Sequence, residues 1–167
     1  MLPRIAILTV SDRSSRGERP DTSGSALAAE IAAQGWPVVK TQICPDEQPQ
    51  ISALLIEWAA DPQVDVILTT GGTGFALRDV TPEATRAVID REAPGIPEAM
   101  RAASLQITPH AMLSRSVAGT RGKTLIVNLP GSPKGAVENL RVLIPVLVHA
   151  VELLAGDPHS ESGHQAR

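Results

Sequence analysis

The sequence predicts an α/β fold of three layers, an α/β/α sandwich in which helices cover both faces of a mostly parallel central sheet. Segments rich in β-branched residues alternate along the chain with helical segments that carry one apolar face. This alternation is typical of right-handed crossovers between parallel strands. The chain has 167 residues, of which 43% are hydrophobic, and this is enough for one compact core. We therefore expect a single domain over residues 1–156, followed by a polar, flexible tail over residues 157–167.

The first half of the chain predicts three strands joined by two helices. The predicted strands are the β-branched runs at residues 4–10, 38–43 and 64–70. Thr22 or Ser23 can cap a helix that ends near Gly35. Asp46 can open the next helix, whose apolar face ends at an Asp-Pro break at residues 61–62. Each strand is thus followed by a crossover, as a parallel sheet requires.

The second half begins with two predicted helices and a hairpin. Thr81 is predicted to cap a helix that runs from Pro82 to about Glu92, because proline favours the first helical position. Another helix is expected to start at Pro97 and to continue through Leu105. The segments 112–119 and 123–129 flank Arg121-Gly122 and predict a hairpin. The hairpin would add an antiparallel pair to the otherwise parallel sheet.

A long helix is predicted to close the domain. It begins at Pro133 and ends at Gly156, with Pro145 as an expected kink. Its apolar side chains recur at helical spacing and predict one buried stripe, formed by Val137, Leu140, Ile144, Leu147 and Val151.

The composition argues against several functional classes. The formal net charge is −3, and the chain has two Trp, one Phe and no Tyr, so it offers little for general nucleic-acid binding. No apolar segment is long enough to span a bilayer, and the start of the chain predicts a strand rather than a signal peptide. Cys44 is the single cysteine, which excludes an intrachain disulfide and is consistent with a cytoplasmic location.

A glycine cluster follows the third predicted strand. Gly71, Gly72 and Gly74 lack side chains, so backbone N–H groups there can approach a ligand closely. The pattern is neither a Rossmann fingerprint nor a P-loop, and three glycines after a strand are more often a tight turn. Parallel sheets, however, bind ligands at the carboxyl ends of their strands. The neighbouring residues therefore decide between the two interpretations.

Carboxylates follow two of the predicted strands. Asp79 lies beside the glycine cluster and is not needed as a helix cap, because Thr81 can serve, so it is a candidate metal ligand. Asp46 follows the second strand, where an aspartate is more often simply the cap of the next helix. Histidine ligation is not expected, because the four histidines show no metal-ligand spacing; they are His110, His149, His159 and His164.

Lys134 gives an independent indication of an anion. If Ser132 is the N-cap of the last helix, Lys134 lies in the first turn, where the helix dipole disfavours a cation. A bound anion would reverse that penalty. The alternative is a solvated lysine that costs at most about 1 kcal/mol.

Several motifs together make the chain similar to a known family. These are TTGGTG, RDVTPEAT, DREAPGIPEAMR, MLSR and NLPGSPKGA. Nearly the whole chain resembles the MogA and MoaB family of molybdenum-cofactor biosynthesis. Arg78 to Pro82 resemble the MogA type, molybdopterin adenylyltransferase, whereas the run VAGTRGKTLIVNLPGSPK is similar to MoaB.

The resemblance implies roles for particular residues. Asp46, the first acid of the Pro-Asp-Glu-Gln motif, and Asp79 would be catalytic and would hold Mg²⁺. The other implied site residues would bind substrate; they are Ser11, Asp12, Arg13, Gly71, Gly72, Thr73, Gly74, Arg78, Ser114, Arg115, Pro130, Gly131, Ser132, Lys134 and Gly135.

The resemblance also implies a reaction. AMP would be transferred from Mg-ATP to the terminal phosphate of molybdopterin, with release of pyrophosphate. A homotrimer and a hand-over of the product to a MoeA-type protein that inserts molybdate are implied as well. The alternative is a MoaB-like protein that binds or carries the pterin without catalysis.

Overall fold

The computed structural model describes residues 1–156, and in it six strands form one sheet in the order β2-β1-β3-β6-β5-β4. The strands are β1 (Ile5–Val10), β2 (Val38–Cys44), β3 (Val66–Thr70), β4 (Arg91–Glu92), β5 (Ala118–Arg121) and β6 (Thr124–Leu129). β1 pairs in parallel with β2 and β3, and β3 with β6. β5 is antiparallel to both β4 and β6. The predicted mostly parallel sheet with an antiparallel hairpin is therefore confirmed.

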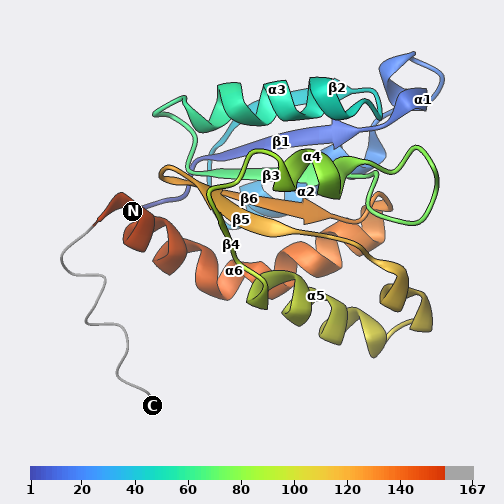
Figure 1. Ribbon diagram of the computed structural model, residues 1–167. Helices are drawn as coiled ribbons and strands as arrows, with labels where there is room; N and C mark the ends of the chain where they lie inside the picture. Colours follow the sequence, from blue (N-terminus) through green and yellow to red (C-terminus); the bar gives the residue numbers. More distant parts are fainter. Residues whose placement is uncertain (157–167) are drawn as a thin grey trace.

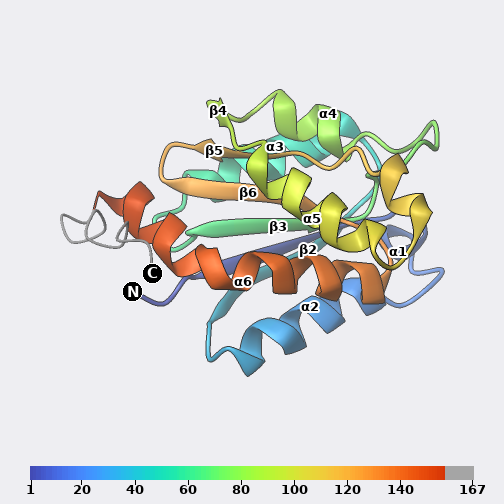
Figure 2. The ribbon, with the colours of Figure 1, turned by 90° about the horizontal axis from the view of Figure 1, so that it is seen from below.

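Helices cover both faces of the sheet (Figures 1 and 2). They are α1 (Asp12–Ser15), α2 (Thr22–Ala33), α3 (Gln48–Ala59), α4 (Thr81–Arg86), α5 (Gly95–Leu105), the 3-10 helix η1 (Pro109–Leu113) and α6 (Pro133–Ala155). α3 and α4 pack on one face, whereas α2, α5 and α6 pack on the other. The expected three-layer sandwich is thus present.

Each face of the sheet has its own apolar core, because side chains along a strand alternate between faces. In β1, Ile5 and Ile7 pack in the core beneath α2 and α6, whereas Ala6 and Leu8 pack in the core beneath α3. All six residues of β1 are buried. The central strands are therefore apolar on both faces, as expected for parallel strands between two layers of helices.

The segment after α4 differs from the prediction. α4 ends at Arg86, and residues 91–92, which were predicted to be helical, form β4 instead. In β4, Arg91 lies opposite Thr120 and Glu92 opposite Gly119. An added Cβ on Gly119 would lie 2.6 Å from the carbonyl oxygen of Arg91, so this close pairing needs a glycine. The long helix predicted to about Glu92 is therefore wrong, because pairing at the sheet edge replaces its last turns.

The predicted strand at 112–119 is also shorter in the structure. Residues 109–113 form η1, and the strand starts only at Ala118. The Thr108 hydroxyl accepts a hydrogen bond from the backbone N–H of His110, which caps η1. The hairpin around Arg121-Gly122 is confirmed.

Three predicted helix caps are wrong. Asp21, rather than Thr22 or Ser23, caps α2 through a hydrogen bond from the N–H of Gly24. Thr81 is already the first residue of α4, and its hydroxyl donates to the carbonyl of Gly71. Asp46 lies before the N-cap position of α3, which Glu47 occupies without a capping hydrogen bond to its side chain.

The buried stripe of α6 agrees with the prediction at three positions and is shifted by one residue at the other two. Leu140, Leu147 and Val151 are buried as expected, but Val137 and Ile144 are half-buried, and the stripe is completed by Ala136 and Leu143. The helix continues through Pro145 and ends at Gly156, whose positive φ of 77° matches the predicted stop. Within residues 1–156, no helix combines the length and the apolar character needed to cross a bilayer. The expected tail at 157–167 lies outside the described residues.

Candidate active site

A cavity of about 610 Å³ opens at the carboxyl ends of the central strands. β1 and β3 are neighbours, yet the chain leaves β1 toward α2 on one face and leaves β3 toward α4 on the other. Such a divergence leaves a crevice between the two connections, which is where α/β sheets bind ligands. The strand order therefore locates the site before any side chain is considered.

The predicted glycine loop forms one wall of this cavity. Gly71 has φ 103°, and an added Cβ would lie 2.2 Å from the carbonyl oxygen of Val10 on the neighbouring strand. Gly72 has φ 64°, and its Cβ would lie 2.5 Å from Oγ1 of Thr81. At both positions a side chain is therefore excluded by the positive φ and also by the lack of space. The loop keeps its backbone close to the crevice.

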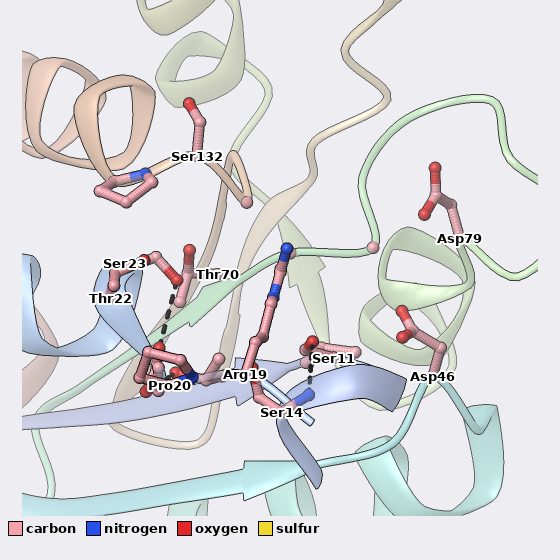
Figure 3. A pocket seen from close by; sticks show the side chains of 17 residues that line it. Ser11, Ser14, Arg19, Pro20, Thr22, Ser23, Asp46, Thr70, Asp79 and Ser132 are labelled. Carbon is pink, nitrogen blue, oxygen red and sulfur yellow. Dashed lines mark hydrogen bonds between the residues drawn. The ribbon is translucent and has the colours of Figure 1, made fainter. Parts of the chain in front are cut away.

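Two helices direct their N-termini at the cavity. α2 has 12 residues and is capped by Asp21, and α6 has 23 residues and is capped by Ser132, whose hydroxyl accepts from the N–H of Gly135 at 3.1 Å. Residues of both caps line the cavity (Figure 3). Helix N-termini combine free N–H groups with a positive dipole end, so this wall favours an anion.

Asp46 lies at the opposite end of the cavity and is fixed by Asp12 (Figure 3). Oδ2 of Asp46 accepts from the N–H of Asp12 at 2.8 Å, and Oδ1 of Asp12 accepts from the N–H of Asp46 at 3.0 Å. This reciprocal pair joins the ends of β1 and β2. Burial raises the pKa of the Asp46 carboxyl, and the charges of Asp12 and Asp79 raise it further. Oδ1 of Asp46 has no hydrogen bond from the described residues.

Asp79 lines the same end of the cavity as Asp46 (Figure 3). The sequence suggested that Asp79 has no structural role. In the structure, however, its Oδ2 accepts a hydrogen bond from the N–H of Ala76 at 3.0 Å. Its Oδ1 has no such bond within residues 1–156. The described residues contain no cluster of three or more His, Cys, Asp or Glu side chains suited to a metal. A cation here would therefore have Asp46 and Asp79 as its side-chain ligands. Oxygen atoms of a bound substrate would be needed to complete its coordination shell.

Arg78 lies apart from the glycine loop's cavity. Its guanidinium forms two hydrogen bonds of 3.0 Å to Asp12 and one of 2.8 Å to Glu47. This cation lowers the pKa of Asp12. Arg13 is exposed and does not line the cavity either. The structure thus places Arg78 against Glu47 and against Asp12, which braces Asp46, rather than against a substrate.

Arg115 holds the loop between β3 and α4 from behind. Its side chain donates to the carbonyls of Gly74 at 2.6 Å and Asp79 at 2.7 Å, and it pairs with Glu83. Its own N–H donates to the carbonyl of Thr73 at 2.9 Å. Although burial opposes the effect, Arg115 lowers the pKa of Glu83. Arg115 therefore positions the loop and does not line the cavity.

A second cavity of about 290 Å³ adjoins the first, and Ser132 lines both. Several predicted site residues fall here rather than in the larger cavity; they are Thr73, Gly74, Ser114, Pro130 and Gly135. Its other walls include the aliphatic side chains of Ile107 and Leu113, together with Arg101 and Asn139. The site thus has one charged compartment and one more apolar compartment.

Lys134 is in the first turn of α6, as predicted, but it points to neither cavity. Its side chain is 79% exposed, and Nζ lies 3.8 Å from Glu138. Other predicted residues do line the larger cavity; they are Ser11, Asp46, Gly71, Gly72, Asp79, Gly131 and Ser132.

Sequence reasoning missed the segment before α2. Arg19, Pro20, Asp21, Thr22 and Ser23 line the larger cavity. In the sequence this segment is a polar connection with a cap, and such connections usually face solvent. A signal was nevertheless present, because the connection that leads from β1 into this segment starts at the carboxyl edge of the sheet, where ligands bind.

Comparison with known proteins connects this geometry to a family. Residues 6–149 match a family model described as "Probable molybdopterin binding domain". The chain is 42% identical over 155 residues to a molybdopterin adenylyltransferase of Helicobacter pylori, covering 92% of this chain and 88% of the relative. It is 43% identical over 166 residues to gephyrin of Dictyostelium discoideum, of which it spans only 23%.

A solved structure agrees with these sequence matches. The molybdopterin biosynthesis enzyme MoaB of Thermus thermophilus superposes with a TM-score of 0.88 at 53% identity, covering 94% of this chain and 99% of that one. The family model spans most of the chain, including β1, β3 and the first turns of α6, which form the cavity. The chain therefore belongs to the molybdopterin-binding domain family.

Proposed function

We propose that the protein is a molybdopterin adenylyltransferase that transfers AMP from Mg-ATP to the terminal phosphate of molybdopterin and releases pyrophosphate. The relatives that carry this name support the proposal, and their match extends over nearly the whole chain. The main observation behind the proposal is that Asp46 and Asp79 lie together at one end of a cavity whose other wall contains two helix N-termini. Carboxylates at one end and anion-binding amides at the other suit a metal-bound polyphosphate.

The chemistry asks for charge compensation rather than proton removal. A terminal phosphate oxygen of molybdopterin would attack the α-phosphorus of ATP, and the bond from that phosphorus to the bridging oxygen of the β-phosphate would break. The bonding electrons leave with pyrophosphate. Like charges about 4 Å apart repel by roughly 4 kcal/mol at an effective dielectric near 20. The N-termini of α2 and α6 and the amides of the glycine loop would offset this repulsion.

The residues present fit a magnesium ion brought by the nucleotide. Mg²⁺ is often held by one or two carboxylates plus substrate phosphates, and Asp46 and Asp79 each keep one oxygen without a hydrogen bond from residues 1–156. When bound, the ion would neutralise part of the phosphate charge. The brace from Asp12 would keep Asp46 aimed at the cavity while the substrates exchange.

The second cavity suits the pterin of the acceptor. It adjoins the charged cavity at Ser132, so a ligand could place its phosphate in one compartment and its ring system in the other. Its aliphatic walls and the amide of Asn139 offer a surface for a flat, polar-edged ring. Assembly as a homotrimer, hand-over to a MoeA-type protein and a cytoplasmic location remain predictions from the sequence resemblance.

Asp46→Asn and Asp79→Asn test the function. With ATP, Mg²⁺ and molybdopterin, we expect wild-type protein to release pyrophosphate and each variant to do so at least about 100-fold more slowly, because both lose an anionic metal ligand. Asp90→Asn is the matched control. Asp90 also accepts a hydrogen bond from a backbone N–H, that of Gly122, but it lies near the amino end of β6, away from the cavity.

Two results would count against the proposal. Near wild-type transfer by the Asp46 or Asp79 variant would remove that residue from the metal site. Tight molybdopterin binding by wild-type protein without any pyrophosphate release would favour the non-catalytic MoaB-like carrier instead.

A further inference from the structure

The larger cavity has an excess of acidic side chains for a site that binds polyphosphate. Its charged lining residues are Asp21, Asp46, Asp79 and Arg19. Asp21 is occupied as a cap, because it accepts from the N–H of Gly24 at 2.8 Å and from the hydroxyl of Thr9 at 2.6 Å. Within residues 1–156, Arg19 is the one cationic side chain in this lining.

Three other cations near the site are already engaged. Arg78 is held by Asp12 and Glu47, and the guanidinium of Arg115 is used by Glu83 and by two carbonyls of the loop. Lys134 is directed toward Glu138. Recruiting Arg78 or Arg115 for a ligand would leave carboxylates unpaired. Arg19, by contrast, forms no hydrogen bond or ion pair through its side chain with the described residues.

The backbone on either side of Arg19 is fixed. Gly17 turns the chain with φ 72°, and the N–H of Glu18 donates to the carbonyl of Arg13 at 2.9 Å. Pro20 follows and limits the backbone of Arg19 to extended conformations. Asp21 then anchors the segment to α2 and to β1. A held backbone therefore presents a free side chain to the cavity, and Figure 3 shows that side chain extending over it.

We propose that Arg19 binds the phosphate chain of ATP in this cavity. The inference rests on the proposed adenylyl transfer and adds the side-chain cation that the sequence motifs did not supply. A guanidinium presents paired N–H donors that match phosphate oxygens and retains its charge at every physiological pH. Its position beside the helix N-termini would place it on the same anion that their amides contact.

The test compares Arg19→Ala with Arg16→Ala by titration calorimetry. Arg16 is the matched control, because it lies in the same connection but is paired with Glu18 and does not line the cavity. Each variant is titrated with Mg-ATP in the absence of acceptor, and separately with adenosine, which has no phosphates. We expect Arg19→Ala to weaken Mg-ATP binding about tenfold, and Arg16→Ala to change it less than about twofold. Adenosine binding should be unchanged in both, and Arg19→Lys should restore part of the loss.

Three results would overturn the inference. If Arg19→Ala binds Mg-ATP like wild type while wild type transfers AMP, Arg19 has no role and the proposed function stands. If it loses adenosine and Mg-ATP equally, the substitution has damaged the cavity rather than removed a phosphate contact. Absence of both Mg-ATP binding and AMP transfer in wild-type protein would instead refute the proposed function, and this inference with it.

Discussion

The half-buried carboxylate of Asp46 lowers the stability of the fold at the position where its charge is needed. Its pKa is raised in the folded protein from a reference of 3.8, first by burial and then by the charges of Asp12 and Asp79. Below the unfolded value both states are protonated and there is no cost. As pH rises through the interval between the two values, the unfolded state ionises first and the folded state loses stability. The cost is complete once the pH exceeds the folded value.

Asp46→Asn should therefore stabilise the protein at neutral pH. The asparagine oxygen can still accept from the N–H of Asp12, while the half-buried charge is gone. Urea unfolding of variant and wild type should show a larger advantage for the variant near pH 7 than near pH 4. A variant that is less stable than wild type at neutral pH would mean that the charge itself holds the Asp12 brace together.

At the scale of single residues, sequence reasoning located the carboxylates but not the cations. Asp46 and Asp79 follow strands that end at one edge, so topology alone brings them together. Arg78 was expected on phosphate, but its partners Asp12 and Glu47 come from other parts of the chain. Arg19 carried no motif. Which carboxylate an arginine pairs with depends on side-chain distances that spacing along the chain does not encode.

Gly71→Ala is predicted to be strongly destabilising because the β3 loop passes against β1. The added Cβ would meet the carbonyl oxygen of Val10 at 2.2 Å, and that backbone is fixed within the sheet. Gly35→Ala is the matched control, since Gly35 has φ +72° but no atom of the described residues lies within 4 Å of the added Cβ. We expect about 1–2 kcal/mol for the control, from conformation alone, and more than about 3 kcal/mol for Gly71. Equal losses in denaturant unfolding would show that the loop can move away.

Among the elements, those with strong apolar patterns were predicted well and those set by distant pairing were not. α3 and β1 follow from their own spacing. The end of α4 does not, because residues 91–92 pair with β5, more than twenty residues further along the chain. Thr81 resembled a cap in the sequence, yet its hydroxyl bonds to Gly71 across the loop. A local pattern cannot report a hydrogen bond whose partner is determined by the folded loop.

Substitutions in the two apolar cores should lower the free energy of unfolding independently of each other. Leu55 of α3 and Leu140 of α6 are both fully buried, but they belong to clusters on opposite faces of the sheet. Leu55→Ala and Leu140→Ala should each lower the free energy of unfolding by about 2–5 kcal/mol. The double variant should lose the sum within about 0.5 kcal/mol, because the side chains share no partner. A coupling well above that would indicate that the sheet transmits strain between its faces.

At this scale the sequence predicted the three layers, because the alternation of strands and helices leaves few ways to cover a parallel sheet. The order of strands was not predicted. It depends on which edge each crossover chooses, and periodicity carries no information on that choice.

The sheet is also assembled out of the order in which its strands are synthesised. β6 is the last strand of the chain, yet it lies between β3 and β5 in the interior of the sheet, and the cap of α6 follows it directly. A nascent chain that has left the ribosome only as far as residue 123 would therefore expose the unpaired edge of β3 and lack one wall of the cavity. Unpaired edges recruit other strands. We therefore expect a chain released before β6 is synthesised to be inactive and prone to aggregate.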